Sequence, residues 1–264
     1  MTEINPQQSP FTPELVQRLQ RALLAEGDEL FSLVQDGAPE VLRALLKNRH
    51  LAEEHLLVLL RRRDLAEDIL NALHSHELTT SSYRLKVVLA AHPKSPTSVL
   101  QSLLPHLHLF DLLGICLHPA TTPDQKLAAE RTIVQRLPAV PLGNRITLAR
   151  RAPSSLLLEL LVGGEAQVIS AALDNPRLKE GSLVQYLSGG RATAHALTTV
   201  FRHLRWQQLP SIRLTLLKNP QTPENIFRQL LASCPLVELK NLRLSNRLTS
   251  RQKLLVAEEL QRHS

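Results

Sequence analysis

The sequence predicts an all-α fold, an α-solenoid in which short helices stack on their neighbours. Apolar residues recur at helical spacing in every segment, and Asn-Pro or His-Pro helix stops recur along the chain. The apolar fraction is 43%, while only 3% of residues are aromatic. A core of this composition consists of Leu, Val, Ile and Ala stripes, as is typical of helical repeats. We therefore predict one solenoid domain over residues 13–264, preceded by a flexible polar tail at residues 1–12.

The clearest repeat unit is the segment 211–231, which contains a helix, a stop, a short turn and a second helix. The first helix ends at Asn219, which we expect to take the left-handed conformation of a helix exit. Pro220 has no amide hydrogen to continue the helix. Thr222 is then expected to cap the next helix, with Pro223 at its first position.

The same punctuation recurs along the chain and sets a series of anchor residues, each at a helix exit. These anchors are Asn48, His92, His118, Asn175, Asn219 and Asn246. Their spacings of about 44, 26, 57, 44 and 27 residues predict supersecondary units of unequal helix count. The longest gap is filled by the segment 145–161, where Arg151 stands at the exit position.

Start and stop signals divide the first half into nine helices. Thr12-Pro13 opens the first, Asp64 with Glu67 has the pattern of a capping box, and Thr122 to Gln125 is a full capping box. The predicted ranges are 13–24, 28–35, 39–47, 52–62, 64–75, 81–92, 95–104, 107–117 and 122–137.

The second half repeats the scheme with Gly163-Gly164 and Gly189-Gly190 as breaks. No segment alternates as a strand would. The predicted helices are 144–151, 154–162, 165–174, 179–187, 193–204, 210–218, 223–232, 236–245 and 250–261.

The turn Asn219 to Pro223, echoed at His92 to Pro96 and loosely at His118 to Pro123, resembles that of the leucine-rich repeat variant family and, more broadly, HEAT-like helical repeats. The likeness spans roughly residues 39–261. It implies a right-handed α-superhelix used for binding. The spacings of about 44 depart from the family's shorter repeat, and the family's iron–sulfur cysteine cluster has no counterpart here.

Motifs for catalysis are missing, so we expect no enzyme and no cofactor. The run His76 to Thr80 begins like the zinc-protease HExxH, but Thr80 replaces the second histidine. Cys116 and Cys234 have no CxxC partner, which predicts neither a disulfide nor a zinc site. The histidine-rich stretch 74–118 could hold a metal, although helix-end capping explains His92 and His118 better. Without a membrane span or signal peptide, a cytoplasmic location is expected.

Basic residues beside the anchors are the main candidate site. A stack of repeats would align them as a basic ridge, made of Lys47, Arg49, Lys94, Arg150, Arg151, Arg177, Lys218 and Arg247. The alternative is that they complement helix dipoles. Arg202, Arg205 and Trp206 form a possible aromatic anchor for a base or a protein, unless the Trp ring fills a gap between helices.

The net charge of +7 favours an acidic partner. We expect a non-enzymatic scaffold or adaptor that binds another protein or an acidic peptide. The alternative is a nucleic-acid-binding solenoid, related to HEAT-like DNA-repair glycosylases, although its scarce aromatics oppose this.

Overall fold

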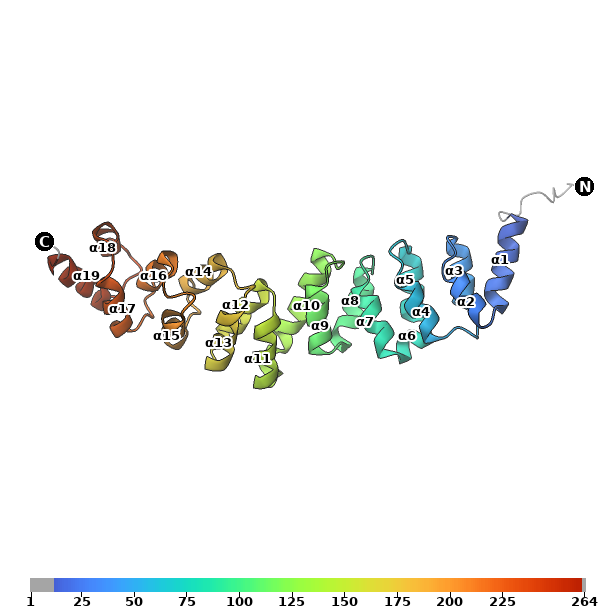
Figure 1. Cartoon of the computed structure of the whole chain (residues 1–264), viewed down its shortest axis with the longest axis horizontal. Helices are drawn as coiled ribbons and strands as arrows, with labels where there is room; N and C mark the ends of the chain where they lie inside the picture. The colour runs from blue at the N-terminus through green and yellow to red at the C-terminus, as the bar shows by residue number, and fades with distance from the viewer. Residues whose placement is uncertain (1–11, 263–264) are drawn as a thin grey trace, which may run out of the picture. The chain divides into compact units, whose positions relative to one another are not determined.

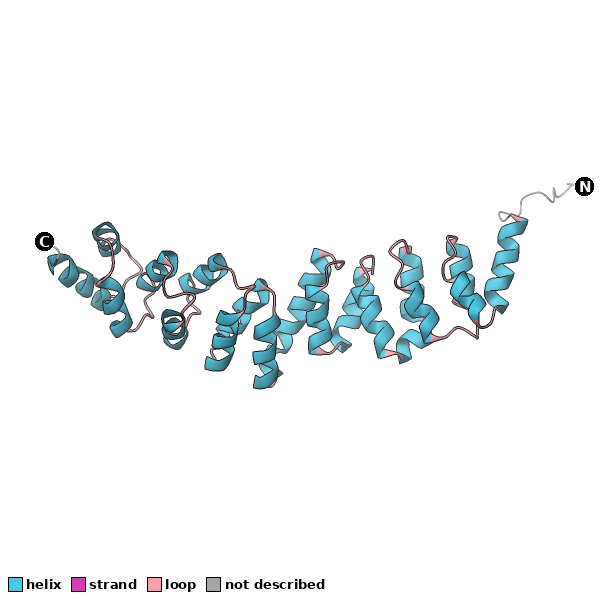
Figure 2. Cartoon of the chain, in the orientation of Figure 1, coloured by secondary structure: helices cyan, strands magenta, loops and turns pink. Residues whose placement is uncertain are grey.

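The computed structural model describes residues 12–262, which form nineteen α-helices and two short 3₁₀ helices without a strand (Figure 2). The predicted all-α fold is confirmed. The chain divides into two compact units, the first ending at Ile133 and the second beginning at Val134, where the sequence led us to expect one body over residues 13–264. The expected tail falls outside the described residues except for Thr12, whose Oγ1 caps the first helix at Leu15 N, 3.3 Å away.

The helices of the first unit stack in two layers (Figure 1). One layer runs α1, α3, α5, α7 and α9 by successive contacts, and α2 and α4 pack beside it, with α4 also against α7. The helices are α1 Pro13–Leu24, α2 Asp28–Leu33, α3 Pro39–Leu45, α4 Glu53–Leu59, α5 Glu67–Ser75, α6 Glu77–Ser81, α7 Tyr83–Ala91, α8 Thr97–Leu103, the 3₁₀ turn η1 Leu104–His106, α9 Leu109–Leu117 and α10 Pro123–Arg136, whose last residues lie past the unit boundary.

The second unit follows the same scheme. Here α11, α13 and α15 stack on one another, as do α12, α14 and α16, and α17 packs on α19. Its elements are η2 Leu137–Ala139, α11 Leu142–Arg151, α12 Ser154–Val162, α13 Ala166–Asp174, α14 Glu180–Ser188, α15 Ala194–Arg202, α16 Pro210–Leu217, α17 Glu224–Leu231, α18 Leu236–Arg243 and α19 Ser250–Arg262.

The two units repeat one plan at an offset of 127 residues (175 − 48). Helix α5 covers 67–75 and α15 covers 194–202, so their bounds coincide after the shift, and α3, α4 and α8 begin where α13, α14 and α17 do. The contacts correspond as well, because α1–α3 and α3–α5 match α11–α13 and α13–α15. The anchor spacings in the sequence already indicated this repeat, because a spacing of about 44 residues followed by one of about 26 occurs twice along the chain.

Side chains at the anchors tie neighbouring helices together in both units. Asn48 Nδ2 donates to Ala22 O and Ala25 O at 2.9 Å each. Its equivalent Asn175 donates to Ala149 O at 2.7 Å and Ala152 O at 3.1 Å. These acceptors lie at the end of the preceding stacked helix, where carbonyls have no intrahelical partner. Asn48 and Asn175 thus each cap the end of a neighbouring helix.

Each anchor also fixes its own turn by accepting a hydrogen bond from the backbone N–H two residues on, in the manner of an Asx turn. Histidine does so through Nδ1, and serine through Oγ. Besides the predicted anchors, His76, His203 and Ser245 make this turn, so that eight residues form four pairs separated by 127 positions: Asn48 and Asn175, His76 and His203, His92 and Asn219, His118 and Ser245. Asp36 makes the same turn with Ala38 N, but its counterpart is Gly163.

Three sequence assignments need correction at these turns. No described non-glycine residue has a positive φ, so Asn219 is not left-handed. It is buried, and its Nδ2 donates to Leu187 O at 2.5 Å, which explains the Asn better than backbone geometry does. Thr222 does not cap α17. Its Oγ1 donates to Leu216 O at 2.6 Å, and the N-cap is Pro223. The last anchor is Ser245, since Arg247 N donates to Ser245 Oγ, whereas Asn246 is exposed.

The capping predictions had mixed outcomes. Asp64 lies before the helix, which begins at Glu67, and its carboxylate binds Arg62 instead. The capping box at Thr122 is confirmed: Thr122 N donates to Gln125 Oε1 at 2.8 Å, and Gln125 N donates to Thr122 Oγ1 at 3.2 Å. The equivalent Gln252 makes the same box with Thr249, which the sequence analysis missed.

Candidate functional site

The eight basic-ridge residues lie at helix ends and turns of the two units. All are exposed except Lys218, which is half-buried. In the first unit Lys47 and Arg49 flank Asn48, and Lys94 follows His92. In the second unit Arg150 and Arg151 end α11, while the other three lie at later turns. Three of the eight thus belong to the first unit and five to the second, and the structure links only Arg151 with Arg177 and Lys218 with Arg247.

None of these eight residues has an ion-pair partner among residues 12–262. Several other arginines do form ion pairs: Arg18 binds Asp36 at 2.9 Å, and Arg145 binds Glu165 at 2.5 Å. Glu224 pairs with both Arg228 and Arg251, and these two arginines lower the pKa of its carboxyl to about 2. These turn cations therefore lack a close acidic partner, although the Lys94 charge, after that of Arg62, helps to lower the pKa of the Asp64 carboxyl.

Two of the predicted residues share a pocket in the second unit. Lys218 and Arg247 line a cavity of about 330 Å³ together with Gly189, Gly190 and Gln221, and no carboxylate lines it. Arg177 and Arg151 are in contact as well, because the guanidinium Nη1 of Arg177 donates to Arg151 O at 3.3 Å. The second unit therefore has a basic cavity and, separately, an arginine pair.

The turn geometry explains why the basic side chains recur. Lys94, Arg177 and Arg247 each occupy the position two residues after an anchor, where the backbone N–H is held by the anchor side chain. Arg205 holds the same position after His203. That bond fixes the backbone, while the side chains differ in their contacts, since Arg177 donates to Arg151 O and Arg205 donates to Asn175 O. Sequence reasoning placed the basic residues beside the anchors without identifying this shared position.

No family model, curated protein or solved structure matched this chain. The internal repeat provides a comparison of its own, because residues 127 positions apart occupy the same place in two copies of one plan. A residue type kept in both copies serves the plan, as the anchors do. A residue type that differs between the two copies is not required by the helical arrangement that they share.

The possible aromatic anchor has a structural role in the second unit. Trp206 is 2% exposed, and its Nε1 donates to Leu173 O at 3.0 Å. Arg205 covers the ring with its guanidinium carbon 4.2 Å from the centroid and donates to Asn175 O at 3.0 Å. This geometry leaves no open ring face for a base and favours the gap-filling alternative. Arg202 is exposed at the end of α15.

The histidines and cysteines also take part in the scaffold. His92 is buried, its Nε2 lies 2.7 Å from Arg62 O, and burial lowers its pKa, which favours the neutral ring over a dipole-complementing cation. His76 binds Leu46 O at 3.0 Å. Burial raises the pKa of the Cys116 thiol to about 12 and raises that of Cys234, so neither is an activated nucleophile. Among the described residues no group of three or more His, Cys, Asp or Glu could hold a metal ion.

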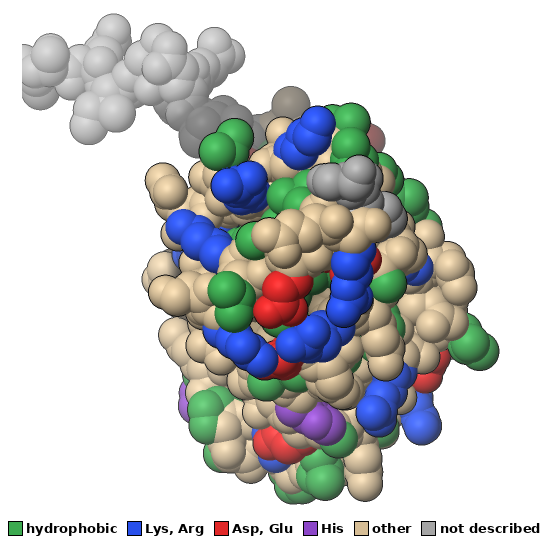
Figure 3. All heavy atoms as spheres, turned by 90° about the vertical axis from the view of Figure 1, so that its left-hand side faces the viewer, with side chains coloured by type: hydrophobic (Ala, Val, Ile, Leu, Met, Phe, Trp, Pro, Cys, Tyr) green, Lys and Arg blue, Asp and Glu red, His purple; other side chains and the backbone are tan. Residues whose placement is uncertain are grey.

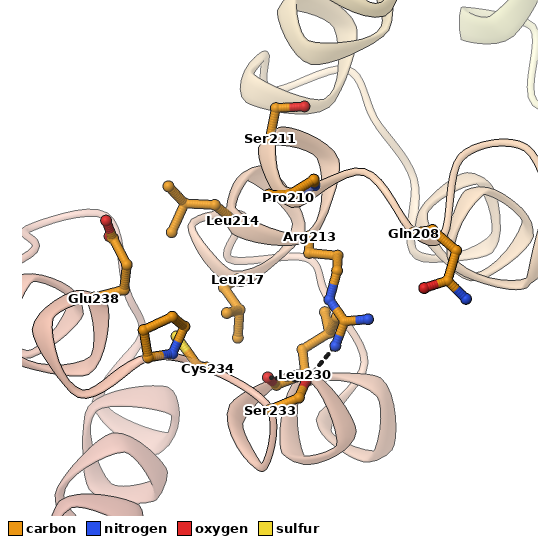
Figure 4. Close-up of a pocket in the computed structure, with 11 residues that line it drawn as sticks. Gln208, Pro210, Ser211, Arg213, Leu214, Leu217, Leu230, Ser233, Cys234 and Glu238 are labelled. Atoms are coloured by element: carbon orange, nitrogen blue, oxygen red, sulfur yellow. Dashed lines mark hydrogen bonds between the residues drawn. The ribbon is translucent and has the colours of Figure 1, made fainter.

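A pocket lies between α16, α17 and α18 in the second unit (Figure 4). Its volume is about 620 Å³, and Leu214, Leu217 and Leu230 make much of its lining. Arg213 crosses it to bind the Ser233 hydroxyl, and Glu238 stands at the other side. One Arg213 donor is thus engaged by Ser233, and the pocket offers mainly apolar surface.

Charges of both signs are interspersed on the face that Figure 3 presents, which holds the C-terminal helices. The ion pairs of Glu224 with Arg228 and Arg251 belong to this region. No described helix combines the length and the apolar character that crossing a membrane requires.

Proposed function

We propose that this chain is a non-catalytic helical-repeat scaffold that binds another protein through an acidic peptide segment. The observation that supports the proposal is the set of turn cations without an ion-pair partner among residues 12–262, two of which, Lys218 and Arg247, share one cavity. A carboxylate entering that cavity would meet two cations and no competing acid. Charge-assisted hydrogen bonds of this kind are the stronger ones.

The repeat architecture fits this role. In each unit, helices stack on the next helix but one, and anchors bridge the stack. We propose that the units belong to an α-solenoid of the HEAT-like or leucine-rich repeat variant kind, as the turn at Asn219 to Pro223 suggests. Such arrays present extended binding surfaces made of equivalent positions in successive repeats.

A fluorescent acidic peptide, such as a run of glutamates, tests the proposal by anisotropy at low and physiological salt. We expect the double substitution Lys218→Gln with Arg247→Gln to weaken binding about tenfold or more, since two charge-assisted bonds are lost. The matched control is Arg228→Gln with Arg251→Gln, which removes the same charge from the same unit but at residues already paired with Glu224. Equal weakening by both pairs, or no binding by the wild type, would overturn the proposal.

Nucleic acid is the alternative occupant of the same cations, and a single-stranded oligonucleotide forms the second arm of the assay. A protein that neutralises several phosphates loses affinity steeply with salt. If the oligonucleotide binds more tightly than the peptide at physiological salt, and the Lys218 and Arg247 substitutions flatten its salt dependence, the function is nucleic-acid binding instead.

A further inference from the structure

A polar pocket opens in the first unit where α5, α6, α7 and α8 meet. Its volume is about 330 Å³. The side chains that define its chemistry are His74, Thr79, Thr80, Lys86, Ser102 and His106. Hydroxyl, imidazole and ammonium groups line it, and no carboxylate does. The Thr80 hydroxyl already donates to Glu77 O at 2.8 Å, so the other hydroxyls, the imidazoles and the Lys86 ammonium are the groups that could donate to a ligand.

Two of its buried polar atoms have no hydrogen-bond partner. Thr79 is 1% exposed, and its Oγ1 has none; the buried Nδ1 of His74 has none either. A buried polar group without a partner costs about 1 to 3 kcal/mol, so such groups are few in folded proteins and call for an explanation. A bound ligand that accepts hydrogen bonds would supply the missing partner for the hydroxyl, which can donate.

The second unit shows that the shared plan does not require this polar lining. Its equivalents of His74, Thr79 and His106 are Phe201, Trp206 and Ser233, 127 positions on. Trp206 fills the place of Thr79 with a buried ring whose Nε1 is satisfied. The equivalent of Lys86 is Arg213, which is bound to Ser233 (Figure 4). Arg213, Leu230 and Ser233, the counterparts of Lys86, Leu103 and His106, line the mainly apolar pocket of about 620 Å³. The first unit therefore differs in the polar, unsatisfied lining of its own pocket.

From these observations we infer that the first unit binds a small oxyanion of the phosphate class between Thr79, Lys86 and the two histidines. The chemistry follows from the lining. A phosphate group has only acceptor oxygens when fully ionised, which suits a donor-rich cavity without carboxylates, and the Lys86 ammonium supplies positive charge. The cavity is larger than one phosphate group, so it has room for a small substituent, as in a phosphomonoester.

This site is distinct from the turn cations of the proposed function, because none of its lining residues belongs to the basic ridge. The two proposals can therefore fail separately. Loss of acidic-peptide binding would leave the phosphate site untouched, and the reverse holds as well.

The test is isothermal titration of the full chain with inorganic phosphate, O-phosphoserine and sulfate at constant ionic strength, together with thermal melts. We expect saturable binding at one site, with Lys86→Met and Thr79→Val each weakening it about tenfold, as loss of a bond to a charged group does. Stronger binding of O-phosphoserine than of inorganic phosphate would identify a phosphomonoester as the ligand, and the opposite order would identify free phosphate. Binding of sulfate as tight as that of both phosphate ligands would overturn the assignment to phosphate.

Thr79→Val also separates binding from structure. It keeps the shape of the side chain and removes the orphaned hydroxyl, so the ligand-free variant should melt at or above the wild-type temperature, while the phosphate-induced rise in melting temperature is lost. Arg213→Gln, at the position equivalent to Lys86, is the control and should bind phosphate like the wild type. The inference fails if no saturable binding occurs at about 10 mM phosphate, if Thr79→Val binds unchanged, or if Arg213→Gln weakens binding as much as Lys86→Met does.

Discussion

Asn175→Ala tests the bridging anchors most directly, because it removes the side chain that joins α11 to the turn after α13. Asn175 is 1% exposed and makes three hydrogen bonds, to Ala149 O at 2.7 Å, to Ala152 O at 3.1 Å and from Arg177 N at 2.8 Å. Each hydrogen bond contributes about 0.5 to 1.5 kcal/mol net, and buried groups left without a partner add to the loss. We expect the free energy of unfolding to fall by about 2 to 4 kcal/mol.

Urea unfolding followed by far-ultraviolet circular dichroism measures this loss. The matched control is Asn246→Ala, at the exposed asparagine beside Ser245, which should change the free energy of unfolding by less than about 0.5 kcal/mol. Asn175→His should lower the free energy of unfolding less than Asn175→Ala does. Histidine makes the same kind of turn in both units, at His76 and His203.

The reasoning would be refuted if Asn175→Ala and Asn246→Ala had the same effect. That result would mean that the two carbonyls at the end of α11 find other partners at no cost, and that the stack does not depend on its bridges.

Three further outcomes follow from single side chains. Because burial lowers the pKa of His92, the folded protein binds fewer protons there than the unfolded chain, and stability should fall as pH drops from about 7 to about 5; His92→Asn, the residue of the second unit, should reduce this pH dependence in urea melts. Thr222→Val should lower the free energy of unfolding by about 1 kcal/mol, because Leu216 O loses its donor; an unchanged urea midpoint would contradict the assigned bond. Cys116, with a thiol pKa of about 12, should react with iodoacetamide far more slowly in the folded chain than in urea, and equal rates would show that the thiol is not buried.

Sequence reasoning recovered the helices other than the short α6, which it did not predict, because the signals of the others are local. Pro, Gly and capping residues act within one turn, so the start of α15 at Thr193 and the capping box at Thr122 could be read directly. The partners of the anchors could not, because Asn48 and Ala22 lie 26 residues apart and meet only when helices stack. Local logic therefore assigned Asn219 to backbone geometry and Thr222 to the wrong helix.

The candidate site followed the same division. The positions of the basic residues beside the anchors were visible in the sequence, but the cavity shared by Lys218 and Arg247 depends on two turns that stacking brings together. Of the pocket around Thr79 only the histidines stood out in the sequence, since His74 and His106 belong to the histidine-rich stretch 74–118, whereas a threonine in a short helix is ordinary. What distinguishes the pocket is that Trp206 stands at the position equivalent to Thr79. Aligning the sequence with itself at a shift of 127 positions would have shown this difference.

Because the same helical arrangement occurs twice in this chain, each helix has two equivalent helices on which it could pack during folding. Asn48 donates to Ala22 O, 26 residues away in the sequence. The equivalent acceptor of the second unit, Ala149 O, is 101 residues away from Asn48 (149 − 48). Loop-closure entropy favours the nearer partner by only about 1 kcal/mol. A second molecule supplies the same acceptors without closing any loop, so exchange of equivalent helices between chains competes with correct folding as concentration rises. Refolding from urea should therefore lose yield in concentrated solution, and the missing protein should appear as dimers built from exchanged, natively paired helices.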